Sequence, residues 1–151
     1  MVIDGGLLTA RSKLEMNGPE KNERMTEQPV QKKILIVDDD PAVSSMLQKL
    51  FRAYHYRTVM AHDGLEALGT VRKEKPDLIV LDVMLPGMDG FKVCRMIKYD
   101  QQLKQIPVII LTSRMTPEDE RLAFQCGANS FVSKSTKTEV ILSEIKNLLK
   151  S

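Results

Sequence analysis

The sequence Ile-Leu-Ile-Val-Asp-Asp-Asp at residues 34–40 decides the fold, because a short run of β-branched and leucine residues ends abruptly in three acids. A continuous apolar run of this length is typical of a strand that is buried on both faces of a parallel sheet. Asp40 and Pro41 are suited to the N-cap and the first position of a helix. The stretch therefore predicts a buried strand that leads directly into a helix, with acids at the strand's carboxyl end.

The same arrangement recurs further along the chain. Asp82, Thr112 and Lys134 each follow directly after an apolar run, and these runs occupy residues 78–81, 108–111 and 131–133. Carboxyl ends of parallel strands meet at one edge of an open α/β sheet, so residues far apart in sequence are expected to converge there. The sequence thus predicts a pocket of clustered acid with one hydroxyl and one ammonium group.

Helical patterns separate the apolar runs. Capping sequences predict helices that begin after Asp40, Asp63, Thr116 and Thr136, and a turn at 86–90 precedes another helix. A further strand is predicted at 57–61. Five strands that alternate with five helices predict an α/β fold, a doubly wound parallel sheet.

The composition fits one ordinary domain. Of the 151 residues, 42% are hydrophobic and 28% are charged, and the net charge of +2 comes without a long basic run, which gives no support to nucleic-acid binding. No apolar stretch has membrane-spanning length, so we expect a cytoplasmic protein without a membrane partner. Residues 1–31 have no sustained period and are predicted to be a flexible extension, with the folded domain at 32–151.

The acids set the chemistry of the predicted pocket. Three carboxylates within a few ångströms, those of Asp38, Asp39 and Asp82, would repel one another by about 4 kcal/mol per pair at ~4 Å and an effective dielectric near 20. A divalent cation relieves this repulsion, and hard oxygen ligands without His or thiolate favour Mg²⁺. An Asp in such a site can attack phosphorus, while Lys134 and Thr112 stabilise the transferred oxygens.

Each of these residues also has an ordinary structural interpretation. Asp40 is expected to act only as a helix cap, a lone acid at a strand end is common, and Thr112 or Lys134 alone would be surface residues. Their joint occurrence at four strand ends is what favours a functional site.

The motifs at 34–40, 81–90 (Leu-Asp-Val-Met-Leu-Pro-Gly-Met-Asp-Gly), 111–113 (Leu-Thr-Ser) and 131–134 (Phe-Val-Ser-Lys) resemble the receiver domain of bacterial two-component response regulators. The resemblance extends over about residues 32 to 150 and is of the single-domain, chemotaxis-regulator-like type. It implies a flavodoxin-like sheet with strand order 2-1-3-4-5. It also implies a signalling domain of a phosphorelay rather than an enzyme.

The resemblance implies specific roles for the residues that carry it. Asp82 would accept a phosphoryl group from a histidine kinase or phosphotransfer protein, with Lys134 as the cation that binds the phosphoryl group. Thr112 and Phe131 would form a coupled switch pair. Mg²⁺ would be bound by Asp39 and Asp82 directly, by Asp38 through water, and by the backbone carbonyl of Met84. One departure is Ser135, which follows Lys134 where relatives usually have Pro.

The resemblance also sets expectations for lifetime and output. Met84 and Arg114 flank the path of a hydrolytic water by family position, and neither is suited to activate it, so a slowly decaying aspartyl-phosphate is predicted. The fourth helix, fifth strand and fifth helix would contact a downstream effector protein. Because the sequence ends at Ser151, we expect no effector domain and no direct DNA binding.

Other classes of protein fit less well. An Asp-dependent phosphohydrolase needs an Asp-x-Asp pattern followed by Thr or Val, which residues 38–41 do not supply. A nucleotide- or flavin-binding protein needs a Gly-rich or hydroxyl-rich loop there, and three acids would repel phosphate. The remaining alternatives are a pseudo-receiver that no longer takes phosphate, against which the intact pocket argues, and the receiver part of a larger regulator.

Overall fold

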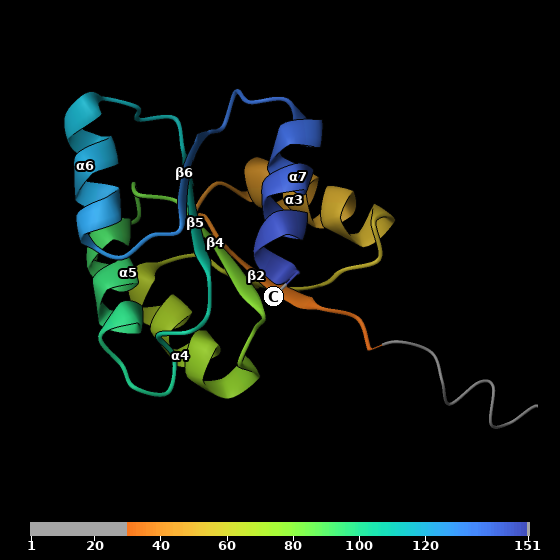
Figure 1. Cartoon of the computed structure of the whole chain (residues 1–151), viewed down its shortest axis with the longest axis horizontal. Helices are drawn as coiled ribbons and strands as arrows, with labels where there is room; N and C mark the ends of the chain where they lie inside the picture. The colour runs from red at the N-terminus through yellow and green to blue at the C-terminus, as the bar shows by residue number, and fades with distance from the viewer. Residues whose placement is uncertain (1–29, 151) are drawn as a thin grey trace, which may run out of the picture. The chain divides into compact units, whose positions relative to one another are not determined.

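The computed structural model describes residues 30–150, which form a five-stranded parallel sheet (Figure 1). Its strands are β2 (Lys33–Val37), β3 (Arg57–Ala61), β4 (Leu78–Leu81), β5 (Val108–Thr112) and β6 (Ser130–Ser133). They lie in the order β3-β2-β4-β5-β6, and all of the pairs are parallel. The predicted flavodoxin-like α/β fold, with strand order 2-1-3-4-5, is confirmed.

Helices cover both faces of this sheet. They are α3 (Pro41–Ala53), α4 (Gly64–Glu74), α5 (Gly90–Lys98), α6 (Pro117–Gln125) and α7 (Thr138–Leu149). Helices α4, α5 and α6 lie on one face, while α3 and α7 lie on the other (Figure 1). The sheet is therefore buried on both sides, as the continuous apolar runs predict.

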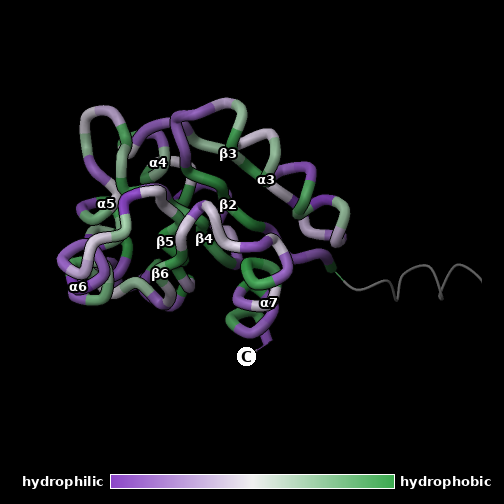
Figure 2. The backbone as a smooth tube through the Cα atoms, turned by 90° about the horizontal axis from the view of Figure 1, so that it is seen from above, coloured by the Kyte–Doolittle hydropathy of each residue, from purple (hydrophilic) through white to green (hydrophobic). Residues whose placement is uncertain are grey.

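Alternate side chains of each strand pack into the core clusters on opposite faces of the sheet. In β2, Leu35 and Val37 pack into the cluster beneath α4–α6, whereas Ile34 and Ile36 pack into the cluster beneath α3 and α7. This follows from the period of two in a strand, and all four side chains are almost fully buried. In Figure 2, strands β2, β4 and β5 are accordingly green, the colour of hydrophobic residues, and they lie between the helices. A rigid, doubly covered sheet thus supports the residues at its edges.

Most of the helix starts are where the sequence predicts them. Asp40 and Asp63 cap α3 and α4 by accepting backbone N–H bonds, and Pro41 is the first residue of α3. Glu66, however, accepts from the N–H of His62 rather than completing a capping box with Asp63. The predicted caps at these helices are confirmed, but Asp63 and Glu66 do not form a capping box, although their spacing in the sequence suits one.

The last helix begins later than predicted. It starts at Thr138 after Lys137, which provides no side-chain cap, rather than after Thr136. The reason lies in the preceding turn, where the N–H of Thr136 donates to the carbonyl of Ser133. The N–H of Ser135 also donates to Ser133 Oγ at 3.1 Å, a bond that a proline at this position could not make. The departure from the family pattern is thus used in a hydrogen-bonded turn.

The flexible extension predicted for residues 1–31 lies outside the described residues except for its last two. Within the described part of the chain, no helix combines the length and apolar character needed to cross a membrane.

Candidate functional site

The strand ends bring the predicted site residues to one edge of the sheet. The register pairs Val37 with Leu81, so Asp38 and Asp82 follow directly after adjacent strands, and the N–H of Asp82 donates to the carbonyl of Val37 at 3.0 Å. Thr112 closes β5 and pairs with Ser133, the residue before Lys134. Residues separated by almost a hundred positions therefore meet because parallel strands share a carboxyl edge.

Three carboxylates form the centre of this site. Asp38, Asp39 and Asp82 can each offer an oxygen such that all three atoms lie within 4.8 Å of one another. Asp38 and Asp82 are buried, with 2% and 5% of their surface exposed, and Asp39 is open to solvent. Nζ of Lys134 lies 2.8 Å from Oδ2 of both buried acids. One ammonium against three carboxylates leaves an excess of negative charge.

Backbone groups fix the two buried carboxylates. Oδ1 of Asp38 accepts from the N–H of Asp40 at 2.9 Å, and the hydroxyl of Ser44 donates to the Asp38 carbonyl. Oδ1 of Asp82 accepts from the N–H of Met84 at 3.3 Å. Each carboxylate thus uses one oxygen for its loop and turns the other toward Lys134. This holds the reactive groups in place before any ligand arrives.

Burial and ion pairing have opposite effects on the charges. Burial raises the pKa of Asp38 above its usual range, although the hydrogen bond from Lys134 acts in the other direction. Burial alone would lower the pKa of Lys134, but its hydrogen bonds to Asp38 and Asp82 outweigh this and leave that pKa raised. Lys134 therefore stays charged and partly compensates two acids that are costly to bury.

The acid cluster is suited to a hard divalent cation. The chemistry of its donors, three carboxylates without His or thiolate within the cluster, matches the oxygen ligands that such cations take. Met84 lies at the same strand end, its N–H donates to Asp82 Oδ1, and the residue is 53% exposed. The residues present thus fit the kind of metal that the sequence predicts.

The two predicted switch residues lie on neighbouring strands. Thr112 is fully buried, and its Oγ1 accepts from the N–H of Arg114 at 3.2 Å. Phe131 is half-buried on β6, where it packs against the core beneath α4–α6. It also lines a hollow that includes Met115 and Phe124. Phe131 therefore has core on one side and an open surface on the other.

Arg114 makes contacts that the sequence did not reveal. Its Nε and Nη2 lie 3.1 and 2.9 Å from Oδ1 of Asp119, and its guanidinium carbon stands 5.9 Å from the centre of the Phe91 ring. In the sequence, Asp119 stands three residues after the cap residue Thr116, a spacing that predicts only a capping role at the start of α6. The spacing of five residues between Arg114 and Asp119 is the feature of the sequence that could have indicated this ion pair.

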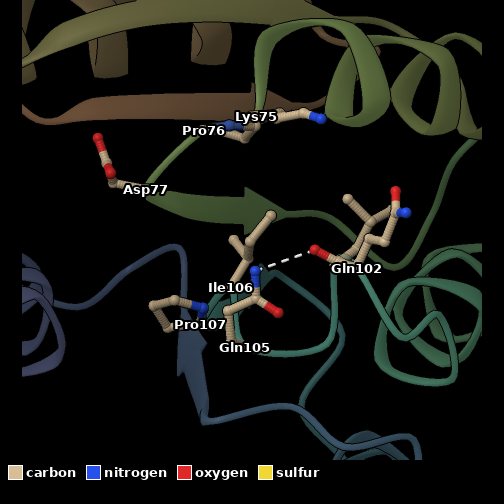
Figure 3. A pocket seen from close by; sticks show the side chains of 8 residues that line it. Lys75, Pro76, Asp77, Gln102, Gln105, Ile106 and Pro107 are labelled. Carbon is tan, nitrogen blue, oxygen red and sulfur yellow. Dashed lines mark hydrogen bonds between the residues drawn. The ribbon is translucent and has the colours of Figure 1, made fainter.

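A pocket at the opposite edge of the sheet is separate from these residues. It lies between the segments that precede β4 and β5, and Figure 3 shows Asp77 on one side and Gln102 and Pro107 on the other. Oδ2 of Asp77 accepts from the N–H of Lys33 at 2.7 Å, which ties this acid to the start of β2. The predicted chemistry therefore belongs to the carboxyl edge and not to this pocket.

Comparison with known proteins identifies the class that this fold and site define. The family model of the response regulator receiver domain matches residues 34–146. The chain therefore belongs to the response regulator receiver domain family, a family of signalling domains in two-component systems.

Three relatives illustrate the likeness. The DNA-binding response regulator MtrA of Mycolicibacterium smegmatis is 36% identical over 121 residues, which are 80% of this chain and 52% of MtrA. The alkaline phosphatase synthesis transcriptional regulatory protein PhoP of Bacillus subtilis is 38% identical over 119 residues, 79% of this chain and 49% of PhoP. A crystal structure of a putative response regulator from Chloroflexus aurantiacus has a TM-score of 0.77 at 32% identity and covers 81% of this chain and all of its own.

These relatives correct the predicted partners. MtrA is described as a DNA-binding regulator, and so is RpaA of Synechocystis, so the expectation of no direct DNA binding is wrong. The chain spans about half the length of the curated relatives it matches. The charge balance of a receiver domain describes only that domain, and it carries no information about DNA binding by the remainder of a longer regulator.

Proposed function

We propose that this protein is a phosphorelay response regulator that accepts a phosphoryl group on Asp82 from a histidine kinase or phosphotransfer protein. The observation that carries the proposal is the position of Asp82, which is buried at a strand end with Oδ2 2.8 Å from Lys134 Nζ and two further acids beside it. In the reaction, an Asp82 oxygen forms a bond to phosphorus while the bond from phosphorus to the donor's histidine nitrogen breaks. That nitrogen keeps the electron pair and takes up a proton.

Mg²⁺ is the cofactor we propose, held by the carboxylates of Asp39 and Asp82, by Asp38 through water and by the backbone carbonyl of Met84. When bound, it neutralises charge on the phosphoryl oxygens. The protein's own groups do the rest. Lys134 already forms an ion pair with Asp82 and can form one with the phosphoryl group instead. The Thr112 hydroxyl can donate a hydrogen bond to another phosphoryl oxygen.

Incubation with acetyl phosphate and Mg²⁺, followed by intact mass measurement, tests the proposal. We expect the mass of one phosphoryl group to be gained, and chelation of the metal to slow the gain strongly. A protein that gains no mass under these conditions would instead be a pseudo-receiver, an interaction module without phosphorylation. We also propose that the protein is located in the cytoplasm.

We further propose that phosphorylation draws Thr112 toward the phosphoryl group and lets Phe131 turn inward from the open side of β6. This would change the surface formed by α6, β6 and α7 and so control a protein contact there. The expected result is a set of amide chemical-shift changes across residues 115–145 when beryllofluoride is added with Mg²⁺. Changes confined to the acid cluster would contradict a coupled switch.

The lifetime of the phosphorylated state gives a further prediction. Replacing Met84 by Asn and Arg114 by Glu should accelerate loss of the phosphoryl group by at least about tenfold. The introduced Asn can orient a water by hydrogen bonding, and the introduced Glu can accept its proton. The decay is measured by intact mass after acetyl phosphate has been removed.

A control is needed because Glu at position 114 would face the Asp119 carboxylate. Met84→Asn alone leaves that region unchanged and should give part of the acceleration. Loss of the phosphoryl group within seconds in the unmodified protein, or slower loss in the double variant, would show that this account of the water's approach is wrong.

A further inference from the structure

Arg114 stands at the edge of the site, yet its guanidinium is bound elsewhere. Its backbone N–H donates to Thr112 Oγ1, which places the residue beside the acceptor. Within residues 30–150, the side-chain hydrogen bonds of Arg114 go to Asp119, and the guanidinium lies over Phe91. Phe91 follows Gly90, the residue whose α-carbon packs against the backbone of Asp82. The guanidinium therefore lies at the α5 and α6 side of the site, while the ammonium of Lys134 is paired with Asp82.

Asp119 is built to hold this Arg. Only 7% of its side chain is exposed, although it carries a charge. Its Oδ1 takes both bonds from Arg114, and its Oδ2 accepts from the hydroxyl of Thr116 at 2.7 Å and from the Thr116 N–H at 3.3 Å. The hydrogen bond from Arg114, followed by that from Thr116, holds the pKa of Asp119 below its usual range. A charged carboxylate in a capping box thus fixes the guanidinium.

We propose that Asp119 is a positioning residue that holds Arg114 away from Asp82 and thereby shortens the lifetime of the phosphoryl group. The inference rests on the proposed phosphorylation of Asp82. A phosphoryl group adds up to about two negative charges and offers oxygens that an Arg can bind as well as it binds a carboxylate. Asp119 and the phosphoryl group therefore compete for one guanidinium.

The outcome of this competition affects hydrolysis. The water oxygen forms a bond to phosphorus on the side opposite Asp82, the bond from phosphorus to the Asp82 oxygen breaks, and the carboxylate leaves with the electron pair. The protons of the water go to inorganic phosphate and to solvent. A guanidinium that lies across the phosphoryl group obstructs that approach and offers no acceptor for the proton. Arg114 held by Asp119 leaves the approach open.

A four-member cycle of variants in the full chain tests the proposal. Asp119→Asn should lengthen the half-life of the phosphorylated protein by at least about twofold, as expected for directly coupled neighbouring side chains. Arg114→Ala alone should change the half-life by less than this, because its guanidinium is already held elsewhere. In the Arg114→Ala background, Asp119→Asn should have no further effect.

Two control variants separate this role from helix capping and from charge. Thr116→Ala removes the capping hydroxyl, which also donates to Asp119 Oδ2, but it keeps both bonds from Arg114 to Oδ1, so it should lower the melting temperature and change the half-life by less than Asp119→Asn does. Glu118→Gln removes one negative charge from the same helical turn, where Glu118 pairs with Arg121 on the exposed surface. It should leave the half-life unchanged.

A second readout does not need the phosphoryl group. The Nε–H resonance of Arg114 should be protected from solvent exchange in the unmodified protein and lose that protection in Asp119→Asn. An equal effect of Asp119→Asn in both backgrounds, or none in either, would overturn the positioning role while leaving the proposed function intact. Failure of the unmodified protein to gain a phosphoryl group would overturn the proposed function, and this inference with it, even if the resonance were protected.

Discussion

Asp82→Asn is expected to reduce the gain of a phosphoryl group from acetyl phosphate and Mg²⁺ to background. Asp82 follows the middle strand of the sheet, and it is buried with the Lys134 ammonium on the oxygen that does not bond to the Met84 N–H. Asn has the same shape and can still accept from the N–H of Met84, so the fold should remain. It lacks the carboxylate that attacks phosphorus. Intact mass and the melting temperature report on the two properties separately.

Asp38→Asn is the matched control. Asp38 is also buried and makes an equal contact with Lys134, but it follows β2 rather than the middle strand β4 and is not the proposed acceptor. This variant should slow labelling without abolishing it, and treatment with hydroxylamine should remove the label, as expected for an acyl phosphate. Labelling of Asp82→Asn to the level of the unmodified protein would assign the acceptor to another residue.

The fold could be predicted almost completely because its signals are local. Most of the strands are continuous apolar runs. The strands predicted at 57–61 and 78–81 are β3 and β4 as observed, and the runs at 108–111 and 131–133 lie within β5 and β6. The late start of α7, at Thr138, depends on the turn before it, in which Ser133 accepts hydrogen bonds from the N–H groups of Ser135 and Thr136. Such bonds compete with helix capping and do not appear in a pattern of residue types.

The position of the site could be predicted for the same reason, but its details could not. Strand ends and parallel pairing are enough to bring Asp38, Asp82 and Lys134 together at one edge. The direction of a long side chain depends on tertiary contacts, which is why the sequence could place Arg114 beside the path of the water but could not show that its guanidinium is bound by Asp119. The match to the receiver domain family describes residues 34–146 and does not indicate which other domains a longer regulator has.

Gly90 is a second residue whose role the sequence could not show. Its place in the motif at 86–90 predicts a turn, whereas the structure makes it the first residue of α5, with its N–H donating to the carbonyl of Val83 at 2.8 Å. A Cβ at this position would lie 2.1 Å from the carbonyl oxygen of Asp82 and 2.8 Å from Cα of Val83. These are backbone atoms, which cannot turn aside as a flexible side chain could.

Gly90→Ala is therefore expected to reduce the free energy of unfolding by about 3 kcal/mol, the upper part of the range for overpacking a buried site. The start of α5 has to move away from β4, and that movement displaces the loop that carries the acceptor, so phosphorylation should slow as well. Gly69→Ala is the control, because Gly69 is exposed within α4 and a Cβ there would meet no atom within 4 Å. That variant should gain about 0.5 to 1 kcal/mol from higher helix propensity. Urea denaturation of both variants measures the difference, and a Gly90→Ala protein as stable as the unmodified one would show that α5 does not need this close approach.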